Sequence, residues 1–191
     1  MIQILPVTVP GYLVPFIIKE MDGISVEQAL GNYTNISVEP NSILGMFLRR
    51  RIKPEYKTKN YQILIYSKKM GSTRAYSVDL KEFQIKAEFS VDLSFEELEE
   101  FYKFLSHGFM LHFQSFVRGF VAAQRLKNER SKIRKKHQGV RSAIRIMLDE
   151  YDMLEYGFSE NQMRHLYYLN LKRGSLSNLH KSVPFNNKII D

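Results

Sequence analysis

The hydrophobic period of the chain changes at Ser94, and this change constrains the fold more than any other feature. Before it, FQIKAEFSV (residues 83–91) alternates apolar and polar side chains, as a strand with one buried face does. After it, apolar residues recur at steps of three and four from Leu98 to Phe120, which predicts a long, largely buried helix. We therefore expect an α+β fold with the sheet first and the helices second.

Residues 1–92 are expected to form a small antiparallel β-sheet with short helices. YQILIYS (61–67) and RAYSVDL (74–80) predict a hairpin, and PGYLVPFII (10–18) predicts another strand. In this arrangement Phe83, Ile85 and Phe89 would pack on the apolar side of the long helix.

Two short helices are expected to interrupt these strands. The spacing of Ser25 and Gln28 is that of a capping box and predicts the first. The second is expected over residues 41–52, because the chain cannot continue as a helix into Pro54. It ends in the cations Arg49, Arg50 and Arg51, which complement the negative end of a helix dipole as well as they would bind phosphate.

The first 18 residues contain no charged side chain. Pro6, Pro10 and Pro15 argue against a helix through them, and no basic flank precedes the apolar run. We therefore expect neither a signal peptide nor a transmembrane helix. An extended arm or edge strand, able to pair with a neighbouring subunit, is the favoured interpretation.

The helical region is expected over residues 93–174, followed by an extended tail over 175–191. Ser94 and Glu97 form a capping box at its start. A helix from there to Lys136 would exceed about forty residues, or roughly 60 Å. We therefore expect its basic end to project from the body or to break near Gly119 or Gly139.

The basicity of the chain is concentrated in one segment. The formal net charge is +8, and residues 125–145 hold nine cations against Glu129 as the one acid. Nine cations are more than are required to complement the dipole at a helix end. In phosphate binding, by contrast, each added cation increases the affinity through counterion release. A polyanion is thus the favoured partner over a merely solvated helix or an acidic protein surface. The cations are Arg125, Lys127, Arg130, Lys132, Arg134, Lys135, Lys136, Arg141 and Arg145.

The last two expected helices resemble a helix-turn-helix in layout. The first is amphipathic, with Arg141 and Arg145 outside an apolar stripe formed by Val140, Ile144, Met147, Leu148 and Tyr151. The second begins at Ser159, capped with Gln162, and its outer face carries nucleic-acid-binding side-chain types. The match is partial, because Asp152 and Met153 stand where the motif prefers an apolar and a small residue. An ordinary helical hairpin is the favoured interpretation of these two helices, and a DNA-reading unit is the alternative. The expected contact residues are Asn161, Arg164, Lys172 and Arg173.

No catalytic constellation is recognisable in the sequence. The chain has no cysteine, which excludes thiolate metal sites and cysteine nucleophiles. His107 and His112 are five residues apart and so face different sides of a helix. The glutamates after Ser94 are explained by the helix dipole. We expect no enzyme activity, no metal and no cofactor.

These patterns favour a non-catalytic, basic nucleic-acid-binding protein. The 125–145 segment would contact phosphates, and the 159–173 helix would contact a groove or bases, with DNA favoured over RNA. Tyrosines near lysines in the sheet, such as Tyr61, offer a base-stacking alternative. A structural or assembly subunit of a large complex, such as a phage or mobile-element particle, is the second hypothesis. There, arms at 1–18 and 175–191 would lock onto neighbouring subunits. We expect a location in the cytoplasm or in a nucleoprotein particle.

Overall fold

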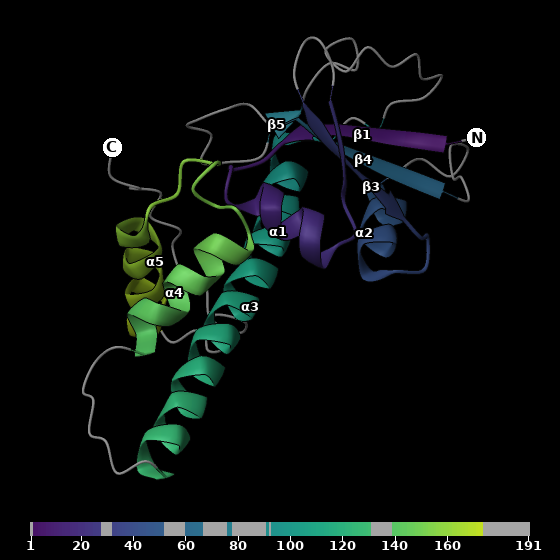
Figure 1. Cartoon of the computed structure of the whole chain (residues 1–191). Helices are drawn as coiled ribbons and strands as arrows, with labels where there is room; N and C mark the ends of the chain where they lie inside the picture. Colours follow the sequence, from purple (N-terminus) through teal and green to yellow (C-terminus); the bar gives the residue numbers. More distant parts are fainter. Residues whose placement is uncertain are drawn as a thin grey trace. The chain divides into compact units, whose positions relative to one another are not determined.

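The chain divides into two compact units, Met1–Leu105 and Ser106–Asp191. The boundary falls within one long helix, so the first turns of that helix belong to the unit that contains the sheet. The computed structural model (Figure 1) describes residues 2–27, 32–51, 60–66, 76–77, 91, 93–130 and 139–173.

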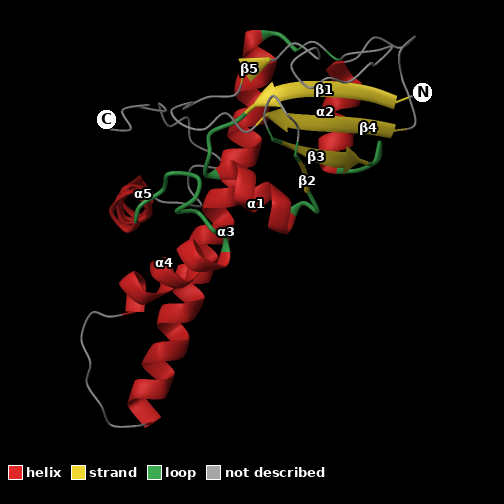
Figure 2. Ribbon diagram, turned by 45° about the horizontal axis from the view of Figure 1, so that its top comes forward, coloured by secondary structure: helices red, strands yellow, loops and turns green. Residues whose placement is uncertain are grey.

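The first unit contains a five-stranded sheet in the order β2-β3-β4-β1-β5 (Figures 1 and 2). β1 runs parallel to β4, and the other pairs are antiparallel. The α+β class is therefore confirmed, but the sheet is mixed where we expected antiparallel pairing throughout. Parallel neighbours need a long crossover, and the segment between β1 and β4 supplies it. The strands are β1 (Ile2–Thr8), β2 (Ile24–Val26), β3 (Tyr33–Val38), β4 (Asn60–Tyr66) and β5 (Tyr76–Ser77).

The N-terminal segment contains an interior strand, so the prediction of an extended arm or edge strand over residues 1–18 is wrong. β1 lies between β4 and β5, and its side chains at Leu5 and Val7 are buried. Pro6 is tolerated there because backbone groups alternate sides along a strand. The carbonyl of Ile4 faces away from β4 and accepts a hydrogen bond from the Val91 N–H at 2.7 Å. Pro6 lies two residues after Ile4, so its backbone groups point to the same side of the strand, away from β4. The N–H that proline lacks would therefore not have bonded to β4.

The predicted hairpin of residues 61–67 and 74–80 is also wrong. Both segments contain a strand, but β1 is inserted between β4 and β5. The short loop spacing suggested direct pairing, whereas the apolar β1 pairs with β4 along seven residues, from Ile2 opposite Asn60 to Thr8 opposite Tyr66. The predicted strand at 83–91 and its packing on the long helix lie outside the described residues, apart from Val91.

The segment predicted as a strand at 10–18 is mostly the helix α1 (Leu13–Glu20). Pro15 is its third residue, where a backbone N–H has no partner within the helix, so proline breaks no bond. The hydroxyl of Tyr12 lies 3.2 Å from that of Tyr102. No helix begins at Ser25: Ser25 belongs to β2 and pairs with Thr34, because strand pairing overrides the local capping signal. Residues 28–31, over which the expected helix would continue, lie outside the described residues.

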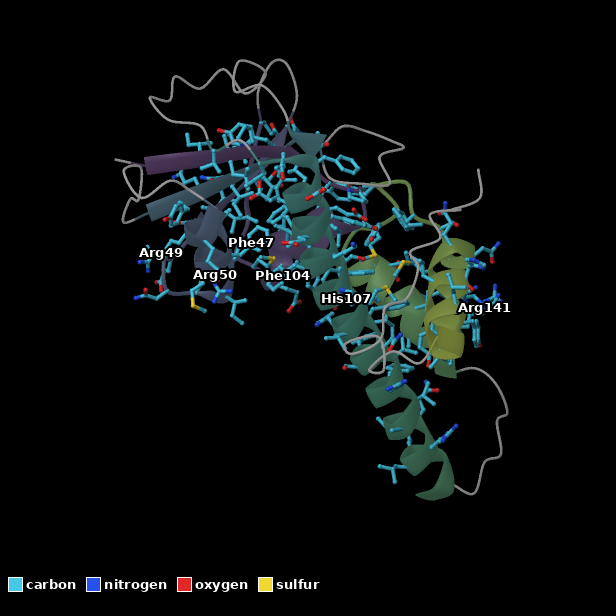
Figure 3. All side chains as sticks on the ribbon, turned by 180° about the vertical axis from the view of Figure 1, so that it is seen from behind. Phe47, Arg49, Arg50, Phe104, His107 and Arg141 are labelled. Carbon is cyan, nitrogen blue, oxygen red and sulfur yellow. The ribbon has the colours of Figure 1, made fainter. Side chains whose placement is uncertain are left out.

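The helix predicted at residues 41–52 is confirmed as α2 (Ile43–Arg51). The Ser42 hydroxyl caps it by accepting a hydrogen bond from the Gly45 N–H at 3.0 Å. Arg49 and Arg50 are exposed at its end (Figure 3), and Arg49 donates a hydrogen bond to the Asn41 Oδ1 at 3.4 Å.

The long helix is α3 (Phe95–Arg130), with 36 residues and a length of roughly 54 Å. The capping box is confirmed: the Ser94 N–H donates to Glu97 Oε2 at 2.8 Å, and the Glu97 N–H donates to Ser94 Oγ at 3.3 Å. The helix runs through Gly119 without a break, and the next helix begins at Gly139. Within the described part of the chain, no helix is both long and apolar enough to cross a membrane.

Two glycines predict opposite responses to alanine. A Cβ at Gly45 would lie 1.9 Å from the Glu39 carbonyl oxygen, whereas a Cβ at Gly119 would meet nothing within 4 Å. We expect Gly45→Ala to destabilise the fold by about 1–3 kcal/mol or more. Gly119→Ala should stabilise α3 by roughly 0.5–1 kcal/mol. Urea unfolding of both variants measures this, and a neutral Gly45→Ala would contradict the close approach.

Candidate functional site

The second unit is built on the apolar face of α3. Phe109, Phe113 and Val117 of α3 are fully buried. α4 (Gly139–Glu150) and α5 (Glu160–Arg173) complete the core. The ring of Phe113 meets that of Tyr167 of α5 edge to face, with centroids 5.9 Å apart. The buried side chains that α4 and α5 contribute are Ala143, Ile144, Met147, Leu148, Met163 and Tyr167.

One histidine considered above has a structural partner. The His112 Nε2 lies 2.7 Å from the Tyr151 hydroxyl, and the two rings meet edge to face. This pair joins α3 to the end of α4. Among the described residues, no three side chains of the metal-binding types cluster closely enough to hold an ion.

α4 has the amphipathic face that its sequence predicts. Its apolar stripe is buried, Val140 is half-buried, and Arg141 and Arg145 are exposed. Gly139 lets the start of α4 approach α3, since a Cβ there would lie 3.1 Å from the Cγ2 atom of Val121. Packing of one face therefore directs both arginines of α4 to solvent.

The connection from α4 to α5 is longer than the tight turn of a helix-turn-helix. It contains two successive Schellman-type caps. In the first, the Met153 N–H donates to the Leu148 carbonyl at 3.0 Å, and Asp152 adopts φ 49°. In the second, the Phe158 N–H donates to the Met153 carbonyl at 3.1 Å, and Gly157 adopts φ 81°. The expectation of one tight glycine turn is thus wrong.

The two residues that depart from the helix-turn-helix pattern have structural roles in this connection. Met153 is fully buried, as the hydrophobic residue after a Schellman cap often is. Asp152 takes the left-handed conformation that the cap requires, which aspartate tolerates better than most residues. The helical hairpin is confirmed, but the connection between its helices differs from the tight turn of a helix-turn-helix.

α5 starts at the predicted cap and exposes the predicted polar face. The Ser159 N–H donates to Gln162 Oε1 at 2.8 Å, and the Gln162 N–H donates to Ser159 Oγ at 3.3 Å. Asn161 is exposed, and Arg164 is half-buried on the next turn.

Further along α5, His165 and Tyr168 are also exposed, and Tyr168 is 46% accessible. Leu171, near the end of the described part of α5, is 38% exposed. The outer face of α5 therefore combines amide, cationic, imidazole and phenol groups with one leucine.

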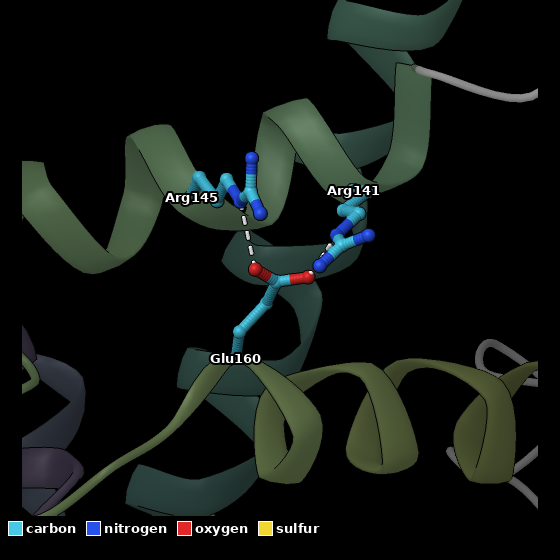
Figure 4. Close-up of polar contacts among 3 residues, drawn as sticks. All are labelled: Arg141, Arg145 and Glu160. Atoms are coloured by element: carbon cyan, nitrogen blue, oxygen red, sulfur yellow. Dashed lines mark hydrogen bonds and ion pairs between the residues drawn. The ribbon is translucent and has the colours of Figure 1, made fainter.

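Glu160, which no sequence pattern predicted to be a site residue, joins α4 to α5 (Figure 4). The Arg141 Nε donates to Glu160 Oε1 at 2.5 Å, and the Arg145 Nε donates to Glu160 Oε2 at 2.7 Å. One carboxylate therefore holds both arginines, with one oxygen for each. The only local signal was an acid directly after the Ser159 cap; its partners are 15 and 19 residues away and cannot be read from spacing.

The two arginines alter the acidity of Glu160. The hydrogen bond from Arg145, and then the hydrogen bond and charge of Arg141, hold the pKa of the Glu160 carboxyl below its usual value, although partial desolvation opposes them. The arginine side chains are 58% and 57% exposed, and that of Glu160 is 20% exposed. The cluster of these three residues, the Arg–Glu–Arg cluster, carries a net charge of about +1 near neutral pH.

The other expected contact residues are only partly described. Arg125 and Lys127 are exposed near the end of α3, next to Leu126, which is 60% exposed. Arg130 ends α3, and Lys172 and Arg173 end α5, but only their backbones are described. Lys132, Arg134, Lys135 and Lys136 lie outside the described residues. Tyr61 is 1% exposed, so it cannot stack on a base.

Comparison of the chain with protein-family models, with curated protein sequences and with solved structures gives no match. Arguments about function therefore depend on the geometry and charge of the residues described above.

The Arg–Glu–Arg cluster predicts a pH-dependent contribution to stability. Because the pKa of folded Glu160 is lowered, the contribution is complete above the unfolded pKa and is lost as pH falls through the folded pKa. We expect Glu160→Gln to melt below the wild type at pH 7, and the difference to vanish in acid. Thermal melts followed by circular dichroism from pH 7 to about pH 3 test this. A difference in melting temperature between the two proteins that persists unchanged down to about pH 3 would contradict this prediction.

Proposed function

We propose that the protein binds nucleic acid without catalysing a reaction, through exposed cations of its second unit. One observation carries the proposal: every cation of the 125–145 segment whose side chain is described is exposed. These are Arg125, Lys127, Arg141 and Arg145. α4 buries Ala143, Ile144, Met147 and Leu148, so packing of that helix presents Arg141 and Arg145 to solvent. Arg125 and Lys127 lie in the exposed last turns of α3.

A phosphate backbone is the partner that suits such a surface best. Each phosphate neutralised releases counterions and changes the salt dependence of log K by about 0.9 for duplex DNA. Guanidinium groups match phosphate oxygens with two parallel N–H donors, whereas an acidic protein surface gains less from added charge. The concentration of the net charge of +8 in this segment supports phosphate contact.

The exposed face of α5 would add contacts beyond phosphate. Asn161 and Arg164 are the side-chain types that pair with adenine and guanine edges, and Tyr168 offers an exposed ring. A helix presenting such groups fits the major groove of DNA better than the narrow groove of RNA, so duplex DNA is the favoured ligand. This function would place the protein in the cytoplasm or in a nucleoprotein particle.

The assembly hypothesis loses one of the two arms on which it depended. Residues Ile2–Thr8 are an interior strand of the sheet, so they are committed within this chain. The tail at 175–191 lies outside the described residues. Nucleic-acid binding is therefore the function that we carry forward.

The proposal predicts a charge effect that is local to the second unit. Replacing Arg125 and Lys127 by Gln should weaken binding of a 20-bp duplex and lower the salt slope by about 2, since each contact contributes roughly 0.9. The matched control is Arg49→Gln with Arg50→Gln, two exposed cations at the end of α2 in the first unit. Fluorescence anisotropy from about 50 to 300 mM salt measures both.

The control variant has the same net charge as the test variant. Equal losses in the two variants would mean that bulk charge alone binds the duplex. A wild-type affinity that does not change with salt would contradict the proposed function itself.

A further inference from the structure

We propose that the carboxylate of Glu160 occupies the place of a backbone phosphate between Arg141 and Arg145, and that it leaves when nucleic acid binds. The inference rests on the proposed function and specifies how part of that surface works. It makes Glu160 an internal competitor that weakens the binding of nucleic acid by this chain.

The geometry around Glu160 is that of a two-arginine anion site. Arg141 and Arg145 are four residues apart on α4, so their side chains emerge from one face of the helix. Each directs its Nε N–H to a different oxygen of the same carboxylate, at 2.5 and 2.7 Å. A phosphate also has two unesterified oxygens available to two such donors, and charge-assisted bonds of this kind are the strong ones.

The cluster is open enough for the exchange. Both arginine side chains are more than half exposed, at 58% and 57%, so an incoming phosphate can reach the guanidinium groups from solvent. Glu160 sits at the first position of α5 and its side chain is only 20% exposed. The acid is thus on the inner side of the pair and the solvent on the outer side.

The exchange is also energetically accessible. Ion pairs between exposed side chains contribute little to stability, because solvent screens them and holding the side chains costs entropy. When a phosphate replaces the carboxylate, the charges of the two arginines remain neutralised by an anion. In addition, the released carboxylate regains full hydration. A remaining negative charge beside a bound phosphate repels it, so removal of that charge should strengthen binding.

A purely structural role for Glu160 predicts the opposite result. If its ion pairs only fasten α5 to α4, neutralising it should loosen the hairpin and leave binding unchanged or weaker. The two readings therefore differ in the sign of the effect on affinity.

The test compares Glu160→Gln with Glu155→Gln. Both changes remove one negative charge from the second unit, but Glu155 is exposed in the connection and is not part of the Arg–Glu–Arg cluster. With a 20-bp duplex at about 0.1 M salt, we expect Glu160→Gln to bind about 5- to 10-fold tighter, with a salt slope steeper by about 1. Glu155→Gln should change affinity less than about twofold. Adding Arg141→Gln and Arg145→Gln to Glu160→Gln should abolish the gain.

Each outcome supports or overturns the inference about Glu160 or the proposed function. Equal affinities of Glu160→Gln and Glu155→Gln overturn the inference, and a salt-dependent wild type then leaves the proposed function standing. If neither the wild type nor Glu160→Gln binds the duplex, both proposals are wrong. Binding by Glu160→Gln alone would support the inference in its strongest form.

A second measurement avoids dependence on the folding of the variant. The carboxyl carbon of Glu160 can be followed by NMR in the wild-type protein as duplex is added. Loss of the arginine bonds should raise the pKa of Glu160 toward its usual value, because those bonds lower it in the free protein. An unchanged titration with bound duplex would overturn the inference. Inorganic phosphate alone serves as the comparison: a rise with duplex supports the inference whether or not free phosphate also produces it, and a rise with free phosphate but none with bound duplex would overturn it.

Discussion

The second unit depends on burial of one face of α3. Phe109, Phe113 and Val117 are fully buried, and α4 and α5 pack with them through their own apolar stripes. Burial of such side chains contributes on the order of 1.5–3 kcal/mol each, far more than any surface charge contact in this unit. Once the apolar stripe of α4 faces inward, Arg141 and Arg145 of the same helix face solvent. Burial of the core therefore determines the exposure of these two cations.

The same packing brings Arg141, Arg145 and Glu160 together at the surface of the second unit. Two arginines one turn apart on α4 repel each other, and the acid that begins α5 compensates them. Glu160 thus serves the hairpin and reduces the positive charge available to a ligand. A carboxylate is well suited to this because it offers oxygens to both arginines, yet its exposed ion pairs are weak enough to be exchanged.

Local sequence signals predicted α2 and the helices of the second unit, but they failed at α1 and at Ser25, which belongs to a strand. The capping boxes at Ser94 and Ser159 and the amphipathic face of α4 are confirmed, since each is determined within a few residues. The position of β1 and its parallel pairing with β4 could not be predicted, because a short apolar segment does not indicate which strand it pairs with. Within the candidate site, exposure of Arg141 and Arg145 followed from periodicity. Their capture by Glu160 did not, because it depends on how two helices meet across a loop.

If nucleic acid binds as we propose, it contacts the described cations of the second unit and not the sheet. Hydrogen–deuterium exchange with and without a 20-bp duplex, at about 50 mM salt, distinguishes the two surfaces. We expect slower exchange in α4, at the start of α5 and in the last turns of α3, with β1, β3 and β4 unchanged. Slower exchange confined to the sheet, or no change in α4 and α5 while the duplex is bound, would contradict the proposal.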